Sequence, residues 1–416
     1  MKYKEIVMLA AALRMAASFS AEDVKRTAHW PVPLEQERAT ILWTKPICVQ
    51  PACYCAWPTA TIRPDGEVIV AFSGDRMSHN CPFGKVMAIR SRDNGETWSA
   101  PETWVNSVID DRDAGLITLD NGDLLLHWFS GITFWYINAK TAPKSMNYRI
   151  WEKLDKTAVR AALGHWTARS ADGGKTWEDP VRIRGQAPHG PVQLKSGRLL
   201  MVGRVSVWPG EYMPGEDKDA KHELPVLVSD DRGRSWTKLT SIVPPKDRYP
   251  DITAFHEPHV AELPDGTLVA QFRWHGKDEI IPQCESADGG KTWTALHPTG
   301  ISGLPPHLTV LPDGRLLTVY AVRSPRLGKE IGEYGCLSDD GGRTWDVEHE
   351  IKFASHFSHD MGYPSSCVLP DGTILTVYYQ TRGANIDIGG EYASPLTSIW
   401  ATKWKLKRNS AALKRH

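Results

Sequence analysis

The chain has 416 residues, with 49 Lys and Arg balanced by 49 Asp and Glu, so its formal net charge is zero. This balance excludes a strongly basic nucleic-acid-binding surface and a polybasic membrane anchor, and it requires that any charged ligand be recognised by a local cluster. A chain of this length can bury a large core, either in one long all-β domain or in two or three average domains.

The first 21 residues have the pattern of a secretory signal peptide. Lys2 and Lys4 precede an apolar run over residues 6–13, and small residues follow at 18–21. The pattern favours a secreted or periplasmic protein, whereas a cytoplasmic location follows if this segment is not a leader. No later run is long and apolar enough to span a bilayer, and we expect residues 409–416 to form a basic tail.

Six later segments each join two apolar runs through a turn that contains glycine. The turn glycines are Gly66, Gly122, Gly197, Gly266, Gly314 and Gly372. The flanking runs have the length of strands, and the Asp-Gly and Asn-Gly pairs in these turns are strong hairpin signals. Six hairpins predict a β-propeller with six antiparallel blades of four strands each.

An octapeptide of the form S-x-D-x-G-x-[TS]-W follows each of the first five hairpins. The copies are Ser91–Trp98, Ser170–Trp177, Ser229–Trp236, Ser286–Trp293 and Ser338–Trp345. Its Asp can accept hydrogen bonds from its own turn, its Gly can adopt a positive φ, and its Trp can pack as a plug. The octapeptide resembles the Asp-box of the sialidase superfamily, which implies a six-bladed propeller. In that family the box lies on the outer part of the blade, so it indicates the fold and not the chemistry.

The sixth hairpin is followed by a strand-like segment, Thr397–Leu406, that has no such box. The apolar residues Ala39–Trp43, which precede the first hairpin, can supply the missing strand of blade six. That pairing closes the ring and removes exposed sheet edges. We therefore predict a single all-β propeller domain over residues 30–408.

An aromatic-rich insertion of about residues 130–164 separates the second hairpin from the third. The part from Asn147 to Leu163 is predicted to be helical. The insertion suits a lid over a pocket, and it suits a packing or oligomer surface equally well, because loops on rigid scaffolds often carry function.

Seven cysteines are present, and Cys53, Cys55 and Cys81 lie close in sequence to His79. The paired C-x-x-C spacing of a zinc site is missing. We therefore expect buried free thiols or one disulfide, with no metal and no cofactor.

The repeat also predicts where the functional site lies. In an antiparallel hairpin the start of the first strand and the end of the second meet at one end of the propeller axis. Nine residues before each turn glycine stand Trp57, Asp113, Pro188, Glu257, Pro305 and Tyr363, and seven residues after it stand Ser73, Phe129, Arg204, Arg273, Ala321 and Tyr379. Close to these positions are Asp75, Arg76, Arg112, Arg323, His189, His256, His259 and His307. Ionisable groups thus collect at one end, while the opposite end carries generic turns, and such clustering is typical of a functional site.

Two of these segments resemble catalytic segments of sialidases, which use a Tyr nucleophile activated by a Glu. A phenol avoids the repulsion that a carboxylate nucleophile meets at an anomeric carbon bearing a carboxylate, but its high pKa requires a neighbouring base. Residues His256–Arg273 are similar to the segment with the catalytic Glu and a carboxylate-binding Arg, and Gly362–Gln380 is similar to the segment that opens with the nucleophile. The resemblance implies Glu257 as base, Arg273 as carboxylate clamp and Tyr363 as nucleophile.

The chain departs from this family at two linked positions. The family opens blade one with Arg-Ile-Pro, whereas Ala56, Trp57 and Pro58 stand here, so the first Arg of the carboxylate-binding triad is missing. Gln380 replaces the Glu that supports that Arg. The third triad Arg is expected at Arg323 or Arg326. Further candidates for substrate contacts are Arg76, Arg112, Arg204, His189, His307 and Trp57.

The group that protonates the leaving oxygen has two candidates. The family places an Asp in the loop after the second strand of blade one, and His79 falls nearest to that place here. Its ordinary pKa suits proton transfer near neutral pH. Asp113, at the top of blade two, is the alternative.

These patterns predict an exo-acting retaining glycoside hydrolase of sialidase type that releases a terminal sugar from glycans. The missing Arg leaves the sugar open among sialic acid, another ulosonic acid and a uronic acid. The His-rich end also suits a polysaccharide lyase, which abstracts a proton beside a uronate carboxylate. A non-catalytic glycan-binding propeller is the third possibility, because a fold alone does not define a function.

Overall fold

The computed structural model describes residues 34–50, 53–139, 145–206, 213, 221–324, 328–356, 358–381, 386–387, 392–393 and 397–407. The predicted leader, the predicted tail and Arg326 lie outside these residues. Among the helices of the described residues, none is long and apolar enough to cross a membrane.

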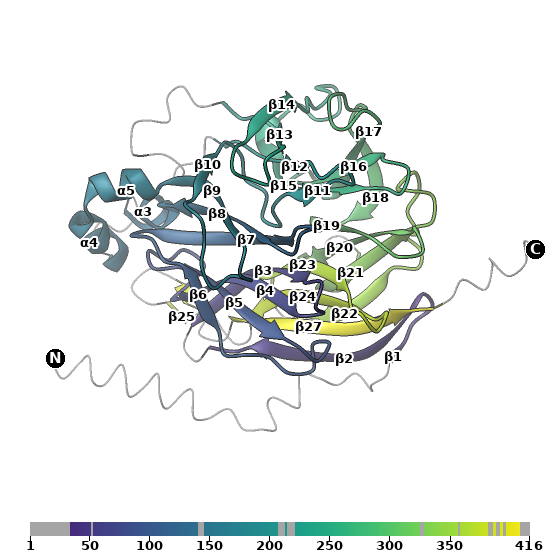
Figure 1. The fold of residues 1–416 in the computed structure, drawn as a ribbon, viewed down its shortest axis with the longest axis horizontal. Helices are drawn as coiled ribbons and strands as arrows, with labels where there is room; N and C mark the ends of the chain where they lie inside the picture. Colours follow the sequence, from purple (N-terminus) through teal and green to yellow (C-terminus); the bar gives the residue numbers. More distant parts are fainter. Residues whose placement is uncertain are drawn as a thin grey trace, which may run out of the picture.

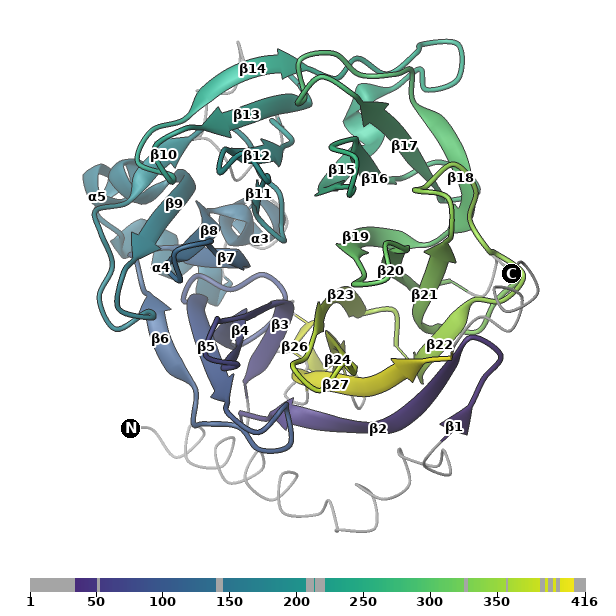
Figure 2. The ribbon, with the colours of Figure 1, turned by 45° about the vertical axis from the view of Figure 1, so that its right-hand side comes forward.

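Six antiparallel sheets surround a central axis, as the sequence predicts (Figure 1). The first strand of each blade faces the axis (Figure 2). Blade one contains β3 (Tyr54–Ile62), β4 (Val68–Arg76), β5 (Lys85–Ser91) and β6 (Glu102–Val105). Blade two contains β7 (Asp110–Thr118), β8 (Leu124–Gly131), β9 (Gly164–Ser170) and β10 (Val181–Ile183). Blade three contains β11 (Val192–Gln193), β12 (Leu199–Val202), β13 (Pro225–Ser229) and β14 (Thr237–Ser241).

The second half of the ring repeats this order. Blade four contains β15 (Phe255–Glu262), β16 (Leu268–Trp274), β17 (Ile280–Ser286) and β18 (His297–Ser302). Blade five contains β19 (Leu304–Val310), β20 (Leu316–Val322), β21 (Gly332–Ser338) and β22 (Ile351–Ser355). Blade six contains β23 (Met361–Val368), β24 (Ile374–Thr381), β27 (Thr397–Leu406), β2 (Ala39–Cys48) and β1 (Leu34–Glu35), and β25 (Ile386–Asp387) pairs separately with β26 (Tyr392–Ala393).

Blade six is closed by strands from opposite parts of the chain, which confirms the predicted closure. Strand β2 pairs antiparallel with β27, and Ala39 lies opposite Leu406. Trp404 of β27 is fully buried, contacts Phe353 at a ring separation of 5.1 Å and donates a hydrogen bond to Thr376. Apolar burial on both sides of the closing strand thus holds the ring together.

Each octapeptide forms the self-contained turn that its residues predict. In the fourth copy, Asp288 accepts from the backbone N–H of Thr292 at 2.9 Å and from its hydroxyl at 2.6 Å, while Ser286 donates to Asp288 at 2.8 Å. Gly290 has φ +88°, and Trp293 donates to its carbonyl at 3.0 Å. The other four copies repeat the Asp contacts through Thr97, Thr176, Ser235 and Thr344.

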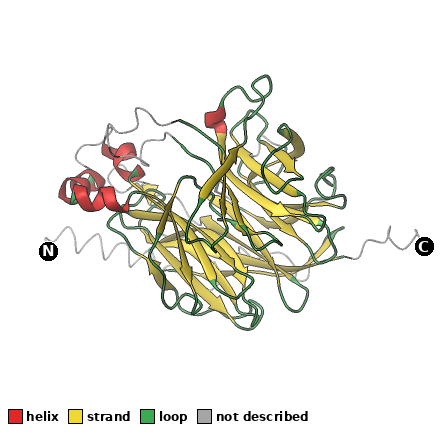
Figure 3. Ribbon diagram, turned by 45° about the horizontal axis from the view of Figure 1, so that its top comes forward, coloured by secondary structure: helices red, strands yellow, loops and turns green. Residues whose placement is uncertain are grey.

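The insertion in blade two is partly helical, but the single predicted helix over 147–163 is two helices. They are α4 (Met146–Lys153) and α5 (Lys156–Ala162), preceded by α3 (Thr133–Ala139) (Figure 3). The break occurs at Asp155, whose side chain accepts from the N–H of Thr157 and caps α5. Trp135 and Trp151 lie 5.2 Å apart within one apolar cluster, so these aromatic residues pack the helices together.

The innermost strands are irregular at the same place in five blades. The pairing register shifts after Ala56, Arg112, His256, Leu304 and Gly362. Non-glycine residues with left-handed backbone stand just beyond four of these shifts, at Trp57, Asp113, Glu257 and Tyr363. A bulge redirects the side chain that follows it, so four blades each turn one functional side chain toward the axis.

Candidate active site

Tyr363 and Glu257 meet at the axis although 106 residues separate them. The Tyr363 hydroxyl donates to Glu257 Oε1 at 2.5 Å, and Arg273 Nη1 donates to Glu257 Oε2 at 2.6 Å and to the Tyr363 oxygen at 3.3 Å. Tyr363 opens β23, Glu257 lies in β15, and Arg273 lies opposite His256 in β16. The repeat offset and the resemblance therefore select residues that do lie together.

The charges of this trio, Tyr363, Glu257 and Arg273, suit a phenol that attacks the substrate only as it loses its proton. Burial raises the pKa of Glu257, but the Arg273 guanidinium, His256 and the hydrogen bond from Tyr363 together outweigh it and bring that pKa to about 2. Burial and the Glu257 carboxylate raise the pKa of Tyr363 well above its ordinary value. At neutral pH the pair therefore consists of a neutral phenol whose proton points at an ionised carboxylate.

Arg323 adds a second guanidinium beside the same phenol. It lies over the Tyr363 ring at 5.3 Å, and its Nε and Nη2 are buried without a hydrogen-bond partner among the described residues. A side chain at Gly362 would bring a Cβ within 3.0 Å of Arg323 Nη2, so glycine is needed there. Buried donors that lack a partner are the groups that an anionic ligand satisfies.

Trp57, which follows Ala56 at the place of the absent family Arg, lies between two other arginines. Arg112 lies 4.1 Å from the Trp57 ring and Arg76 lies 4.8 Å from it. Arg76 is fully buried and forms a two-pronged pair with Asp110, with Nη2 at 2.9 Å from Oδ2. Sequence reasoning did not identify Asp110. Because Asp110 pairs with Arg76, Arg112 is the cation over Trp57 that has no equally close carboxylate. Arg112 Nη1 lies 4.0 Å from Asp110 Oδ2.

Asp113 is a buried carboxyl close to the trio. Its Oδ2 accepts from Gln186 at 2.9 Å, and its Oδ1 is buried without a partner within the described part of the chain. Burial raises the pKa of Asp113 to about 6. The Glu257 charge adds to that rise. Asp113 is thus placed to hydrogen-bond a ligand, and it is neutral in weak acid.

His79 stands at the rim, on the loop that follows β4. Its ring meets the Trp57 ring edge-on at 5.0 Å, and its Nδ1 lies 3.0 Å from the Tyr54 hydroxyl and 3.3 Å from Asp360 Oδ1. Asp360 also accepts from Tyr54 at 2.8 Å and from Tyr379 at 2.9 Å. Sequence reasoning did not select Asp360 or Tyr54. The signal available in the sequence was the position of Asp360, which lies three residues before Tyr363 and directly precedes β23.

Three histidines fill the axis beside Tyr363. The rings of His259 and His307 stack at 4.3 Å, and His189 lies 4.8 Å from His307 and 6.4 Å from Tyr363. Burial lowers the pKa of His189 to about 3, and the other two are also held well below their ordinary value. These imidazoles are therefore neutral and form a polar, uncharged floor.

Arg204 lies on the blade-three side of the site. It is buried and donates from Nη2 to Ser206 at 2.9 Å. Burial lowers the pKa of His256 to about 3, and the positive charge of Arg204 contributes to this decrease. The structure thus places Arg204 near the residue that precedes Glu257.

The cysteines are all free thiols. In the part of the chain that the structure describes, no three His, Cys, Asp or Glu side chains are arranged to hold a metal ion. Cys53 lies 3.8 Å from Asp75 Oδ1, and Cys81 accepts from the N–H groups of Met77 and Phe83.

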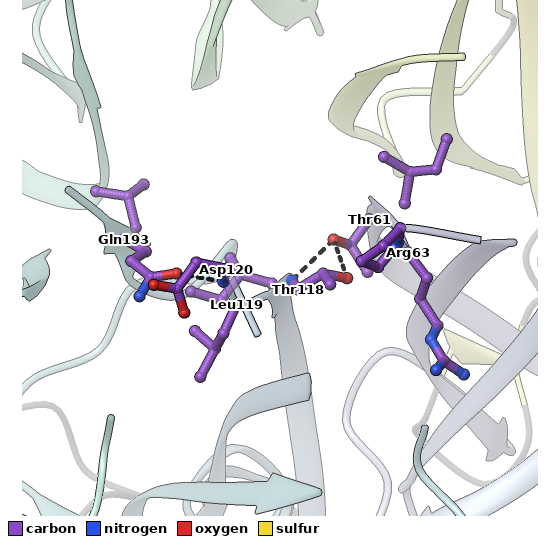
Figure 4. Close-up of a pocket in the computed structure, with 10 residues that line it drawn as sticks. Thr61, Arg63, Thr118, Leu119, Asp120 and Gln193 are labelled. Atoms are coloured by element: carbon purple, nitrogen blue, oxygen red, sulfur yellow. Dashed lines mark hydrogen bonds between the residues drawn. The ribbon is translucent and has the colours of Figure 1, made fainter. Parts of the chain in front are cut away.

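The opposite end of the axis carries a shallow pocket between the turns of blades one to three (Figure 4). Thr61 donates to the Thr118 hydroxyl at 3.0 Å and accepts from the Thr118 N–H at 3.0 Å, and Gln193 accepts from the Asp120 N–H at 2.7 Å. Its lining residues include none of the predicted site residues. The polar side chains that link these turns satisfy one another.

Comparisons with known proteins agree with this architecture. The family described as BNR repeat-like domain matches residues 146–377. A sialidase from Paraclostridium sordellii is 26% identical over 264 residues, which are 59% of this chain and 59% of that protein, so the chain spans little more than half of this curated relative.

Solved structures show the same fold at low sequence identity. A protein of unknown function from Dyadobacter fermentans DSM 18053 superposes with a TM-score of 0.68 at 22% identity and covers 89% of this chain and 99% of that one. A mutant of the NanB sialidase from Streptococcus pneumoniae superposes with a TM-score of 0.58 at 16% identity, covering 94% and 73%.

Proposed function

Because this chain belongs to the BNR repeat-like domain family, we propose that it is a retaining, exo-acting glycoside hydrolase of sialidase type that releases a terminal acidic sugar. The observation that carries the proposal is the contact of 2.5 Å between the Tyr363 hydroxyl and Glu257. A neutral phenol held against an ionised carboxylate is an activated nucleophile.

The reaction proceeds in two steps at Tyr363. The phenol oxygen attacks the anomeric carbon as its proton passes to Glu257, the glycosidic bond breaks as an acid, His79 or Asp113, protonates the leaving oxygen, and a glycosyl-tyrosine forms. Water then attacks the same carbon and gives its proton to the base left by that acid, and the tyrosine oxygen leaves with the proton that Glu257 returns. Two inversions give net retention of configuration. Arg273 stabilises the Glu257 carboxylate before the first proton transfer and after the second.

The acidic character of the sugar rests on the arginines. Arg273 and Arg323 flank the phenol, and Arg112 stacks on Trp57. Buried guanidinium groups recognise carboxylates through paired hydrogen bonds. With Ala56 at the place of one family Arg, the carboxylate of the substrate meets a different set of cations from that of a sialidase.

The test is release of a chromophore from synthetic aryl glycosides of α-sialic acid, other ulosonic acids, uronic acids and neutral sugars. We expect release from an acidic member, and loss of about 10³-fold or more in Tyr363→Phe, because nucleophile removal has effects of this order or larger. Tyr320→Phe is the matched control, since Tyr320 is also a buried phenol that donates to a carboxylate, that of Glu350.

The outcomes separate the three functions that the sequence leaves open. Release that fails in Tyr363→Phe and persists in Tyr320→Phe supports the hydrolase. An unsaturated product that absorbs in the ultraviolet, formed from a uronate polymer without hydrolysis, would indicate a lyase. Binding of a glycan with no turnover of any substrate would indicate a non-catalytic propeller.

A further inference from the structure

Asp360 collects hydrogen bonds from three side chains at the rim of the site. Tyr54 and Tyr379 each donate a phenol proton to its Oδ1, at 2.8 and 2.9 Å, and His79 Nδ1 lies 3.3 Å from the same oxygen. Burial raises the pKa of Asp360, but the hydrogen bonds, that of His79 first, bring it to about 2. Asp360 is therefore a carboxylate at neutral pH.

This arrangement fixes which ring nitrogen of His79 carries a proton. The single proton of the Tyr54 hydroxyl goes to Asp360, so the Tyr54 oxygen is left to accept from His79 at 3.0 Å. Both neighbours of Nδ1 are then acceptors, and Nδ1 must carry hydrogen. Nε2 is consequently the nitrogen that gains or loses a proton.

The His79 side chain is partly open to solvent. It is 46% exposed, although the ring meets Trp57 edge-on at 5.0 Å. The same Trp57 ring lies 6.3 Å from that of Tyr363. One indole thus separates the rim histidine from the nucleophile, and the aglycone of a bound glycoside must leave past this rim.

We propose that His79 is the catalytic acid and base of this site and that Asp360 is its positioning residue. The proposal rests on the proposed function. In the first step imidazolium Nε2–H protonates the glycosidic oxygen as the C–O bond breaks, the leaving group departs as an alcohol, and Glu257 receives the proton of Tyr363. In the second step neutral Nε2 takes a proton from water as the water oxygen bonds to the anomeric carbon and the bond from that carbon to the Tyr363 oxygen breaks. The departing Tyr363 oxygen regains its proton from Glu257.

Asp113 is less suited to this role because of its position. It is 4% exposed and is bonded to Gln186, inside the bulged strand β7. No described group orients it toward the rim. A buried carboxyl at that place contacts the sugar, whereas a leaving group that extends into solvent meets His79.

The sharpest experiment varies the leaving group. Departure of nitrophenolate needs little protonation, whereas an alkyl alcohol needs an acid. For His79→Ala and His79→Gln we expect kcat/KM to fall about 100-fold or more on an alkyl glycoside and less than about 10-fold on the nitrophenyl glycoside of the same sugar. We also expect azide to restore turnover of the nitrophenyl glycoside, because azide attacks the glycosyl-tyrosine without a base.

The pH dependence of kcat/KM tests the positioning role of Asp360. The charged and titratable groups that face His79 are Asp360, Tyr54, Arg76 and Arg112. Desolvation of the ring lowers the pKa of His79, and the Asp360 carboxylate opposes that shift. Asp360→Asn removes the opposing charge, so the basic limb of kcat/KM should move to lower pH. Asp346→Asn is the matched control, since Asp346 holds surface His349 at 2.7 Å.

Each outcome decides the matter, with thermal unfolding run on every variant to exclude misfolding. A loss selective for poor leaving groups supports the assignment. An equal loss on both glycosides, or no loss on either, overturns the assignment of His79. The proposed hydrolase function still stands in that case, provided that the wild type cleaves the glycosides and Tyr363→Phe does not. A wild type that cleaves no glycoside overturns both.

Discussion

The two ends of the propeller axis are built from the same six hairpins but differ in how well their groups are satisfied. At the turn end, Thr61, Thr118, Asp120 and Gln193 bond to one another across the blades (Figure 4). At the other end, four non-glycine residues of the innermost strands adopt positive φ, and buried atoms of Asp113 and Arg323 lack partners among the described residues. Left-handed backbone costs about 1–3 kcal/mol at each such residue. In a repeated scaffold, the functional end can therefore be recognised as the end where the blades depart from their regular structure.

The largest expected effect compares two glutamates of one strand. Glu257 lies at the irregular end of β15, and Glu262 lies at the turn end, where it accepts from the Lys195 N–H. Glu257→Gln should lower kcat/KM on the cleaved glycoside by about 10²–10⁴-fold, because the phenol loses its base. Glu262→Gln should leave kcat/KM within about two-fold. Equal losses in the two variants would remove the functional distinction between the ends.

An intermediate effect concerns stability and its pH dependence. Asp113 has a folded-state pKa of about 6, above its ordinary value of 3.8 because of burial, so ionising it destabilises the folded protein. Asp113→Asn should therefore raise the free energy of unfolding by on the order of 2–3 kcal/mol above pH 6, with the gain disappearing as pH falls below about 4. Urea titrations at several pH values measure this difference. A gain that is independent of pH would show that ionisation is not its cause.

The smallest effect is expected at the turn end. Thr118→Val removes a hydroxyl that accepts from Thr61 and leaves the backbone N–H bond in place. The free energy of unfolding should fall by about 1 kcal/mol, with unchanged kcat/KM. A loss of activity comparable with that of Glu257→Gln would mean that the two ends are coupled.

Much of the fold follows from the sequence because the repeat fixes it. Turn glycines and octapeptides define the blades, and the strand at 39–43 is available to pair with the last strand of the ring. Offset counting brings Glu257 and Tyr363 to one end because bulges occur at equivalent places. Counting does not reveal partners: Arg76 lies close to the counted position Ser73, yet it is paired with Asp110.

The groups that sequence reasoning missed lie outside the repeating part of each blade. Asp360 precedes β23, and Tyr54 begins β3 before the counted positions. Their contacts depend on the packing of blade six against blade one, which no periodic pattern encodes. The break between α4 and α5 was missed for a similar reason, since a single capping residue, Asp155, overrides an otherwise continuous helical pattern.

The closure of blade six has a consequence for how the ring is made. Strands β1 and β2 are synthesised first among the blade strands, but β27, which pairs with β2, comes last, so β2 keeps one edge unpaired until residue 406 has been synthesised. Five blades can form during translation, whereas the sixth must wait for the whole domain. Because Ala39 and Leu406 are neighbours, a short peptide joining them would permit new termini in another blade. Such a circular permutant would complete its last sheet from adjacent segments of chain.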